Sequence, residues 1–101
     1  MKGEGCLGAL KAMGEENRIR ILRHLLAGEC TVGGLSESLD ISQYNVSKHL
    51  AILRSAGLVT SRKAGRERFY CVADDCRIRT SAGLKVMDLG CCSFRIDDLP
   101  K

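Results

Sequence analysis

The chain has 101 residues, which fits one domain, and a domain this small buries only a modest core. No apolar run approaches the roughly 20 residues that a membrane span needs, and residues 1–6 lack the apolar stretch of a signal peptide. The net charge of +4 gathers in Ile41–Val72, which holds six basic residues and one acidic residue. We therefore expect a cytoplasmic protein with a local basic patch, the charge distribution that phosphate binding requires.

Two amphipathic segments open the chain. Apolar residues recur three positions apart from Leu7 to Met13, which predicts a first helix over about Glu4–Met13. A second helix is predicted over about Glu16–Ala27, where acidic residues suit the first turn and Gly28 is placed to end the helix. We expect the arginines of this second helix, Arg18, Arg20 and Arg23, to form a solvated face.

Two further helices follow, separated by a short turn. Thr31 is a predicted N-cap for a helix over about Val32–Leu39, because its hydroxyl can accept a hydrogen bond from the first helical turn. Ser42 is predicted to cap a fourth helix, which extends to about Ala56. The buried face of this fourth helix is predicted to hold Val46, Leu50 and Leu53.

The hydrophobic period changes after Gly57. Leu58–Lys63 and Arg68–Val72 are predicted strands, and the four residues between them predict a hairpin turn. A mainly α chain with a small β-hairpin, in the order of four helices and then two strands, is typical of a winged helix-turn-helix in the α+β class. We expect residues 1–101 to form one such domain.

The last quarter of the chain has a less regular pattern. Ile78, Leu84 and Met87 have the spacing of an inward helical face, which favours a helix over Arg77–Leu89 followed by an extended tail. Alternation of Cys92, Phe94 and Ile96 is instead typical of a strand. The segment is thus predicted as a helix or an extended tail, and the helix is favoured.

The fourth helix and the hairpin carry the chemistry that suits DNA. The outer side chains of such a helix can meet base edges in the major groove, where glutamine and asparagine pair with adenine. A hairpin with a basic tip can reach phosphates or a minor groove. The residues expected to contact DNA are Ser42, Gln43, Tyr44, Asn45, Ser47, Lys48 and Arg54 on the helix, and Arg62, Lys63, Arg66 and Arg68 on the hairpin. His49 borders the predicted core, so we expect it to pack there.

Several stretches resemble the bacterial ArsR/SmtB family of metalloregulatory repressors. They are NRIRIL from Asn17, LSESL from Leu35, ISQYNVSKHL from Ile41 and LRSAGLV from Leu53, and RKAGR from Arg62 with Phe69 and Tyr70 resembles the family's wing. The match covers about Leu7–Val72. It implies a homodimer that binds a palindromic operator in double-stranded DNA and blocks transcription until an inducer binds. It also implies that residues 1–13 and 77–101 form the dimer interface.

The inducer is a separate question. Zinc-type sensors of that family carry an aspartate and histidines on the last helix, whereas the two histidines of this chain, His24 and His49, lie elsewhere. The positions that correspond to the family's arsenite-binding cysteines are Thr31 and Gly33, with Cys30 one residue away. What remains is the adjacent pair Cys91 and Cys92. Some relatives are known to sense through such a pair near the C-terminus.

Adjacent thiols suit a soft ion. Arsenite and antimonite take three thiolates, and Cys91 and Cys92 supply two. The third is expected from Cys76 or from Cys6 of the partner subunit. Sensing of an oxidant, reactive sulfur or a small molecule stays open, as does a protein-interaction module without DNA binding. We expect no enzyme, because the sequence lacks a nucleophile–base pair, a phosphate loop and suitably spaced carboxylates.

Overall fold

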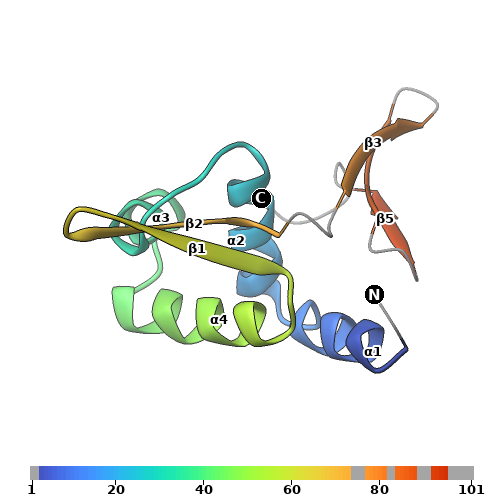
Figure 1. Ribbon diagram of the computed structural model, residues 1–101, viewed down its shortest axis with the longest axis horizontal. Coiled ribbons are helices and arrows are strands. Elements are labelled where there is room, and N and C mark those ends of the chain that lie inside the picture. The colour runs from blue at the N-terminus through green and yellow to red at the C-terminus, as the bar shows by residue number, and fades with distance from the viewer. Residues whose placement is uncertain (1–2, 74–76, 82–83, 89–91, 96–101) are drawn as a thin grey trace.

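The computed structural model describes residues 3–73, 77–81, 84–88 and 92–95 (Figure 1). Four helices come first: α1 (Gly3–Ala12), α2 (Glu16–Leu26), α3 (Val32–Leu39) and α4 (Gln43–Ser55). Five strands follow: β1 (Val59–Ala64), β2 (Glu67–Val72), β3 (Arg77–Ser81), β4 (Leu84–Asp88) and β5 (Ser93–Arg95). The predicted order of four helices and a two-stranded wing is confirmed. None of the described helices is long and apolar enough to cross a membrane.

Side-chain caps fix where the middle helices begin. Thr31 accepts a hydrogen bond from the Gly34 backbone N–H at 3.0 Å, and Ser42 accepts one from the Asn45 backbone N–H at 3.2 Å. The turn between α3 and α4 is tight because Asp40 adopts a left-handed conformation, with φ of 55°. Asp tolerates that conformation better than most residues. The two predicted N-caps are confirmed, and α3 has the predicted bounds.

The core lies where the four helices and the base of the wing meet. Each helix contributes a buried stripe, and Leu58 and Val59 close the core from the side of the wing. The largest fully buried side chains are Ile21, Leu22, Leu35, Val46, Leu50, Leu53, Leu58, Val59 and Met87. The predicted inner face of α4 is therefore confirmed, and its other positions are exposed except for the half-buried His49.

Two arginines of α2 are engaged in the fold rather than solvated as predicted. Arg18 Nε donates to the Ala12 carbonyl at 2.6 Å, and Arg20 Nη2 donates to the Leu39 carbonyl at 2.8 Å. Both acceptors belong to the last residue of a helix, where carbonyls lack partners within the helix itself. These arginines therefore brace the ends of α1 and α3.

The wing is an antiparallel hairpin with a two-residue turn. Its register runs from Val59 opposite Val72 to Ala64 opposite Glu67, so each strand reaches one residue further into the turn than predicted. Gly65 makes the turn with φ of 64°, which a glycine adopts without steric cost. The segment before α3 also joins β2, because Cys30 and Tyr70 exchange backbone hydrogen bonds of 3.0 and 2.8 Å.

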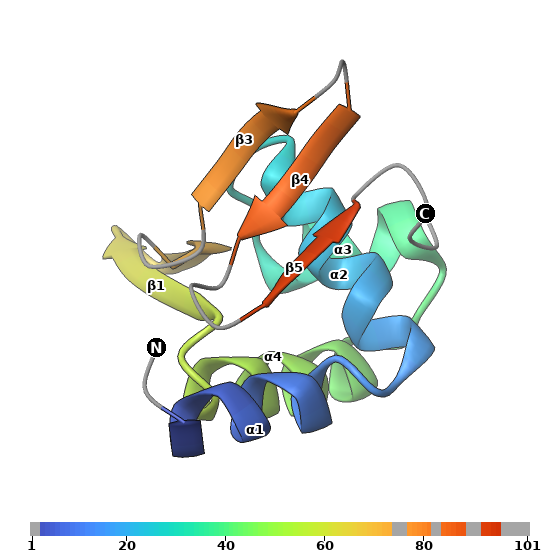
Figure 2. The same ribbon diagram turned by 90° about the vertical axis from the view of Figure 1, so that its right-hand side faces the viewer.

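The favoured helix over Arg77–Leu89 is wrong. The described residues there form an antiparallel sheet in the order β3–β4–β5, and the strand alternative holds for Ser93–Arg95 (Figure 2). Pairing explains the difference, because Ile78, Met87 and Phe94 stand opposite one another across the sheet. Met87 is fully buried and Phe94 packs against the core. This sheet lies at the end of the molecule away from the wing turn (Figure 1).

Candidate nucleic-acid interface

The solvent face of α4 is polar along its first two turns. Gln43, Tyr44, Asn45, Ser47 and Lys48 are exposed, whereas Val46 between them is fully buried. Helical periodicity produces this separation, since inward positions recur every three or four residues. The backbone N–H groups of the first turn also point out of the N-terminal end of α4, where an anion can meet them. This part of the helix therefore presents donors and acceptors to a ligand.

Tyr44 and Lys48 form a pair on this face. The Tyr44 side chain is 73% exposed, and the Lys48 ammonium nitrogen lies 5.7 Å from the centre of the Tyr44 ring. The residues are four positions apart, so the helix places them on adjacent turns of one face. The face of an aromatic ring attracts a cation, and the cation keeps its positive charge. The pair therefore offers a positive charge and a flat apolar surface side by side.

The wing tip carries a second group of cations. Lys63 and Arg68 stand opposite each other in the hairpin, and Arg66 lies in the turn itself. All three are exposed, and Arg68 Nη1 donates to Ser61 Oγ at 3.1 Å. The wing tip and the N-terminal end of α4 lie at the same end of the molecule (Figure 1). The structure thus brings together two of the groups that the sequence places in the interface.

Arg62 differs from the other cations of the wing. Its Nε donates to Oε2 of Glu29 at 3.0 Å, and its Nη2 donates to the second carboxylate oxygen of Glu29. The hydrogen bonds from Arg62 lower the pKa of the Glu29 carboxyl below its ordinary value, and the same bonds raise the pKa of Arg62. Arg62, expected in the interface, is therefore held in an ion pair within the protein.

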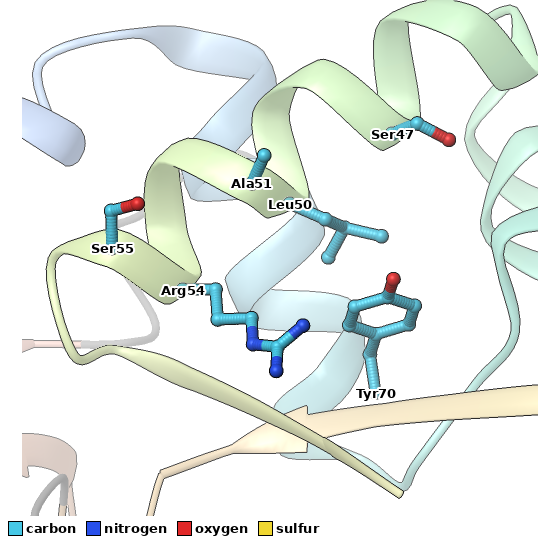
Figure 3. A pocket seen from close by; sticks show the side chains of 6 residues that line it. All are labelled: Ser47, Leu50, Ala51, Arg54, Ser55 and Tyr70. Atoms are coloured by element: carbon cyan, nitrogen blue, oxygen red, sulfur yellow. The ribbon is translucent and has the colours of Figure 1, made fainter. Parts of the chain in front are cut away.

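A groove of about 500 Å³ separates α4 from the wing (Figure 3). One wall is the side of α4 that carries Ser47, Leu50, Ala51, Arg54 and Ser55, and Tyr70 of β2 forms the other. Figure 3 shows the Arg54 guanidinium directed across the groove toward the Tyr70 ring. Arg54 lies on the last turn of α4, far along the helix from Gln43. Tyr70 is a lining residue that the sequence indicated only as part of the wing pattern.

The predicted thiol ligands are only partly described. Cys92 is half-buried and packs against the core beside Phe94. Cys91 and Cys76 lie outside the described residues, and Cys6 belongs to α1 but its side chain is not described. Within the part of the chain that the structure describes, no group of three or more His, Cys, Asp or Glu side chains could hold a metal ion.

The two cysteines of the wing base have local contacts. Cys30 is half-buried beside the start of α3, and its backbone is bonded to Tyr70. Cys71 Sγ lies 3.2 Å from Thr60 Oγ1 on the neighbouring strand. Both positions suit a structural role, since a reduced cysteine packs as a small apolar side chain.

Comparisons with known proteins agree on one family. Residues 15–61 match the model of the arsR family of bacterial regulatory proteins. The transcriptional activator HlyU of Vibrio cholerae is 48% identical over 64 residues, which are 63% of this chain and 59% of HlyU. An HTH-type transcriptional regulator of Methanocaldococcus jannaschii is 35% identical over 88 residues, which are 86% of this chain and 96% of that protein. The chain thus spans less than two thirds of the length of HlyU.

Solved structures of similar proteins share the fold. A structure described as reduced HlyU from Vibrio cholerae superposes with a TM-score of 0.66 at 44% identity, covering 70% of this chain and 75% of that chain. A homodimeric winged helix-turn-helix DNA-binding domain from Mycobacterium bovis superposes with a TM-score of 0.69 at 28% identity, covering 71% of this chain and 67% of that chain.

Proposed function

Because the chain belongs to the ArsR/SmtB family of bacterial regulatory proteins, we propose that it is a cytoplasmic, sequence-specific DNA-binding regulator of transcription. The observation that carries the proposal is the common location of two sets of exposed polar side chains. The polar first turns of α4 and the basic wing tip lie at one end of the molecule, and both are exposed. The relatives named above are transcriptional regulators, and the role proposed here is binding rather than catalysis.

Base reading and phosphate contact are assigned to different residues. Gln43, Tyr44 and Asn45 occupy the end of α4 that approaches base edges in helix-turn-helix proteins. Ser42, Ser47, Lys48 and the wing cations Lys63, Arg66 and Arg68 are assigned to the phosphate backbone. Arg54 faces the groove toward Tyr70, so its role in this scheme is contact with a strand that passes between α4 and the wing.

The regulator is proposed to act as a homodimer. A small domain gains buried apolar surface by pairing, and α1 exposes Leu7 and Leu10. The Mycobacterium bovis domain that superposes on this chain is described as homodimeric. Residues 1–13 and 77–101 remain the proposed dimer segments. The described part of the second segment consists of strands, so the interface would be built from α1 and the sheet β3–β4–β5.

Repression relieved by a thiophilic ion is the proposed mode of control. Cys91 and Cys92 are adjacent, and thiolates select soft ions such as arsenite and antimonite. Cys76 or Cys6 of the partner subunit would supply a third thiolate. The contact of Cys92 and Phe94 with the core gives a route by which ligation at the pair would disturb the sheet that holds the proposed dimer.

A thiol-based redox sensor is the second candidate. One observation favours it: a solved relative is described as reduced HlyU, so at least one similar protein has a defined reduced form. In that case an oxidant or reactive sulfur would release DNA, and arsenite would be inert. HlyU is called a transcriptional activator. If this chain acts as HlyU does, its binding to DNA would activate transcription instead of repressing it.

DNA release by the purified protein separates these modes of control. The duplex would be one selected by the wild-type protein from random sequences, and its affinity would be measured with arsenite, peroxide or persulfide added. The proposal expects arsenite to weaken binding in the wild type and to have no effect on Cys91→Ser/Cys92→Ser. Release by peroxide or persulfide alone supports the redox sensor. A protein that binds no duplex DNA at any salt concentration would be a protein-interaction module instead.

A further inference from the structure

We propose that Glu29 is a positioning residue for DNA binding, which holds the wing in place through Arg62, and that Arg62 serves this clamp rather than contacting DNA. The inference rests on the proposed DNA-binding function. It assigns a role to a residue outside both the helix-turn-helix motif and the wing, and it separates Arg62 from the neighbouring wing cations.

The pair joins two distant parts of the chain. Glu29 lies in the short segment between α2 and α3, two residues before the Thr31 cap, whereas Arg62 lies 33 residues later in β1. The guanidinium donates two hydrogen bonds, one to each carboxylate oxygen. This two-point geometry fixes the orientation of the arginine as well as its distance from the carboxylate.

Phe69 completes the clamp. It is the partner of Arg62 in the hairpin register, and the Arg62 guanidinium carbon lies 5.0 Å from the centre of its ring. The Glu29 side chain thus extends across β2 and accepts hydrogen bonds from an arginine of β1. The adjacent residue Cys30 is bonded to Tyr70 of β2 through the backbone. The segment before α3 is thus tied to β2 by its backbone and to β1 by a side chain.

This connection sets the position of the wing tip relative to the helix-turn-helix. The clamped segment leads directly into α3, and Arg62 is followed at once by Lys63 of the tip. A wing held in its bound position before DNA arrives has less freedom to lose on binding, so affinity rises without a new contact to DNA. Loosening the clamp should weaken binding for the same reason.

The orientation of Arg62 favours this role over phosphate contact. Neighbouring residues of a strand point to opposite faces of the sheet. Tyr70 lines the groove against α4, so Phe69 and its partner Arg62 belong to the face turned away from α4. Lys63, by contrast, belongs to the same face as Tyr70. The negative charge of Glu29 also offsets the positive charge of Arg62, which leaves Arg62 less attraction for a phosphate.

Four variants separate positioning from phosphate contact. Glu29→Gln, Arg62→Gln, Arg62→Lys and the exchanged pair Glu29→Arg/Arg62→Glu are compared for affinity and salt dependence on the selected duplex. Glu37→Gln on α3 controls for the loss of an exposed negative charge, and Lys63→Gln controls for the loss of a wing cation.

The clamp predicts that Glu29→Gln and Arg62→Gln each weaken binding about threefold to tenfold with an unchanged salt slope. Arg62→Lys keeps the charge but loses the planar fork, so it should fail like Arg62→Gln. The exchanged pair should return to within about twofold of wild type. Lys63→Gln should lower the salt slope by about 0.9, the value for one lost phosphate contact.

Three results would overturn the inference. A salt slope lowered by about 0.9 in Arg62→Gln, with Arg62→Lys close to wild type, would make Arg62 a phosphate contact. If Glu29→Gln bound the duplex more tightly than the wild type, and by the same factor as Glu37→Gln, the only effect of Glu29 would be repulsion of the DNA phosphates. Amide hydrogen exchange of β1 and β2 without DNA is the independent readout. It should accelerate in Glu29→Gln and recover in the exchanged pair, and unchanged exchange would disprove the clamp even if the protein bound no DNA.

Discussion

The Nε2 atom of His49 lies 3.6 Å from the Oε2 atom of Glu15, so a residue of α4 contacts the residue that caps α2. The same carboxylate oxygen accepts the Arg18 backbone N–H at 3.1 Å. His49 is half-buried, while its neighbours Ser47 and Lys48 are exposed. The polar run of α4 therefore divides into side chains that face solvent and one imidazole that packs against the rest of the domain.

Replacing Glu15 tests this structural contact. Glu15→Ala removes the acceptor for the first turn of α2 and the partner of His49, so the free energy of unfolding should fall by about 1 kcal/mol. Urea denaturation measures the change. Glu16→Ala, which removes a charge one residue later in the same turn, is the matched control and should cost less. Equal stability of the two variants would contradict the capping role of Glu15.

Lys48 is expected to act on DNA phosphates. Lys48→Ala should weaken binding to every duplex by a similar factor and lower the salt slope by about 1, because one fewer counterion is released. Titrations at several salt concentrations measure this slope. Arg23→Ala makes the same charge change on α2, outside the proposed interface and dimer segments, and should leave the slope unaltered. An unchanged slope in Lys48→Ala would remove this residue from the interface.

Gln43 is expected to read a base. Gln43→Ala should relax the preference at one base pair by about 1–3 kcal/mol and leave the other positions as selective as before. A set of duplexes with single base-pair changes provides the measurement. Ser38→Ala, at an exposed position of α3 that lies outside the groove between α4 and the wing, serves as the control. If Gln43→Ala lost the same affinity for specific and random DNA, Gln43 would not carry base recognition.

The close packing of Gly34 against Cys30 makes a prediction about stability. A Cβ atom at Gly34 would lie 2.6 Å from Cys30 Sγ, so Gly34→Ala should destabilise the protein by about 1–3 kcal/mol despite the better helix propensity of alanine. The same change in a Cys30→Ala background should cost less, because only the 3.3 Å approach to Thr31 Oγ1 remains. Gly33→Ala is the control, since its Cβ would have an ordinary 3.9 Å contact with Gln43. Thermal unfolding of the four variants shows whether the two sites are coupled.

Much of the helix-turn-helix could be predicted because its signals are local. Thr31 and Ser42 each lie directly before an apolar repeat, and each caps its helix as the pattern indicates. The buried and exposed positions of α4 follow from one helical period. The candidate reading face of α4 needed no information from other parts of the chain.

The failures involve partners distant in sequence. Ile78 and Met87 have helical spacing, but β pairing aligns them with each other and with Phe94. That alignment depends on the antiparallel pairing of β4 with β3 and β5, which a short periodic window does not reveal. The bonds of Arg20 to Leu39 and of Arg62 to Glu29 likewise join residues that are far apart in sequence, so a local pattern does not predict them. Charge alone placed Arg62 with the wing cations, and only the fold brings a carboxylate to it.

Selection of duplexes from a random pool by the purified wild-type protein tests the central claim most directly, namely that α4 and the wing together read DNA. The account predicts enrichment of a two-fold symmetric site whose half-sites lie about one helical turn apart, with an affinity that falls linearly with the logarithm of salt concentration. Recovery of unenriched sequences, together with an affinity that does not respond to salt, would contradict it.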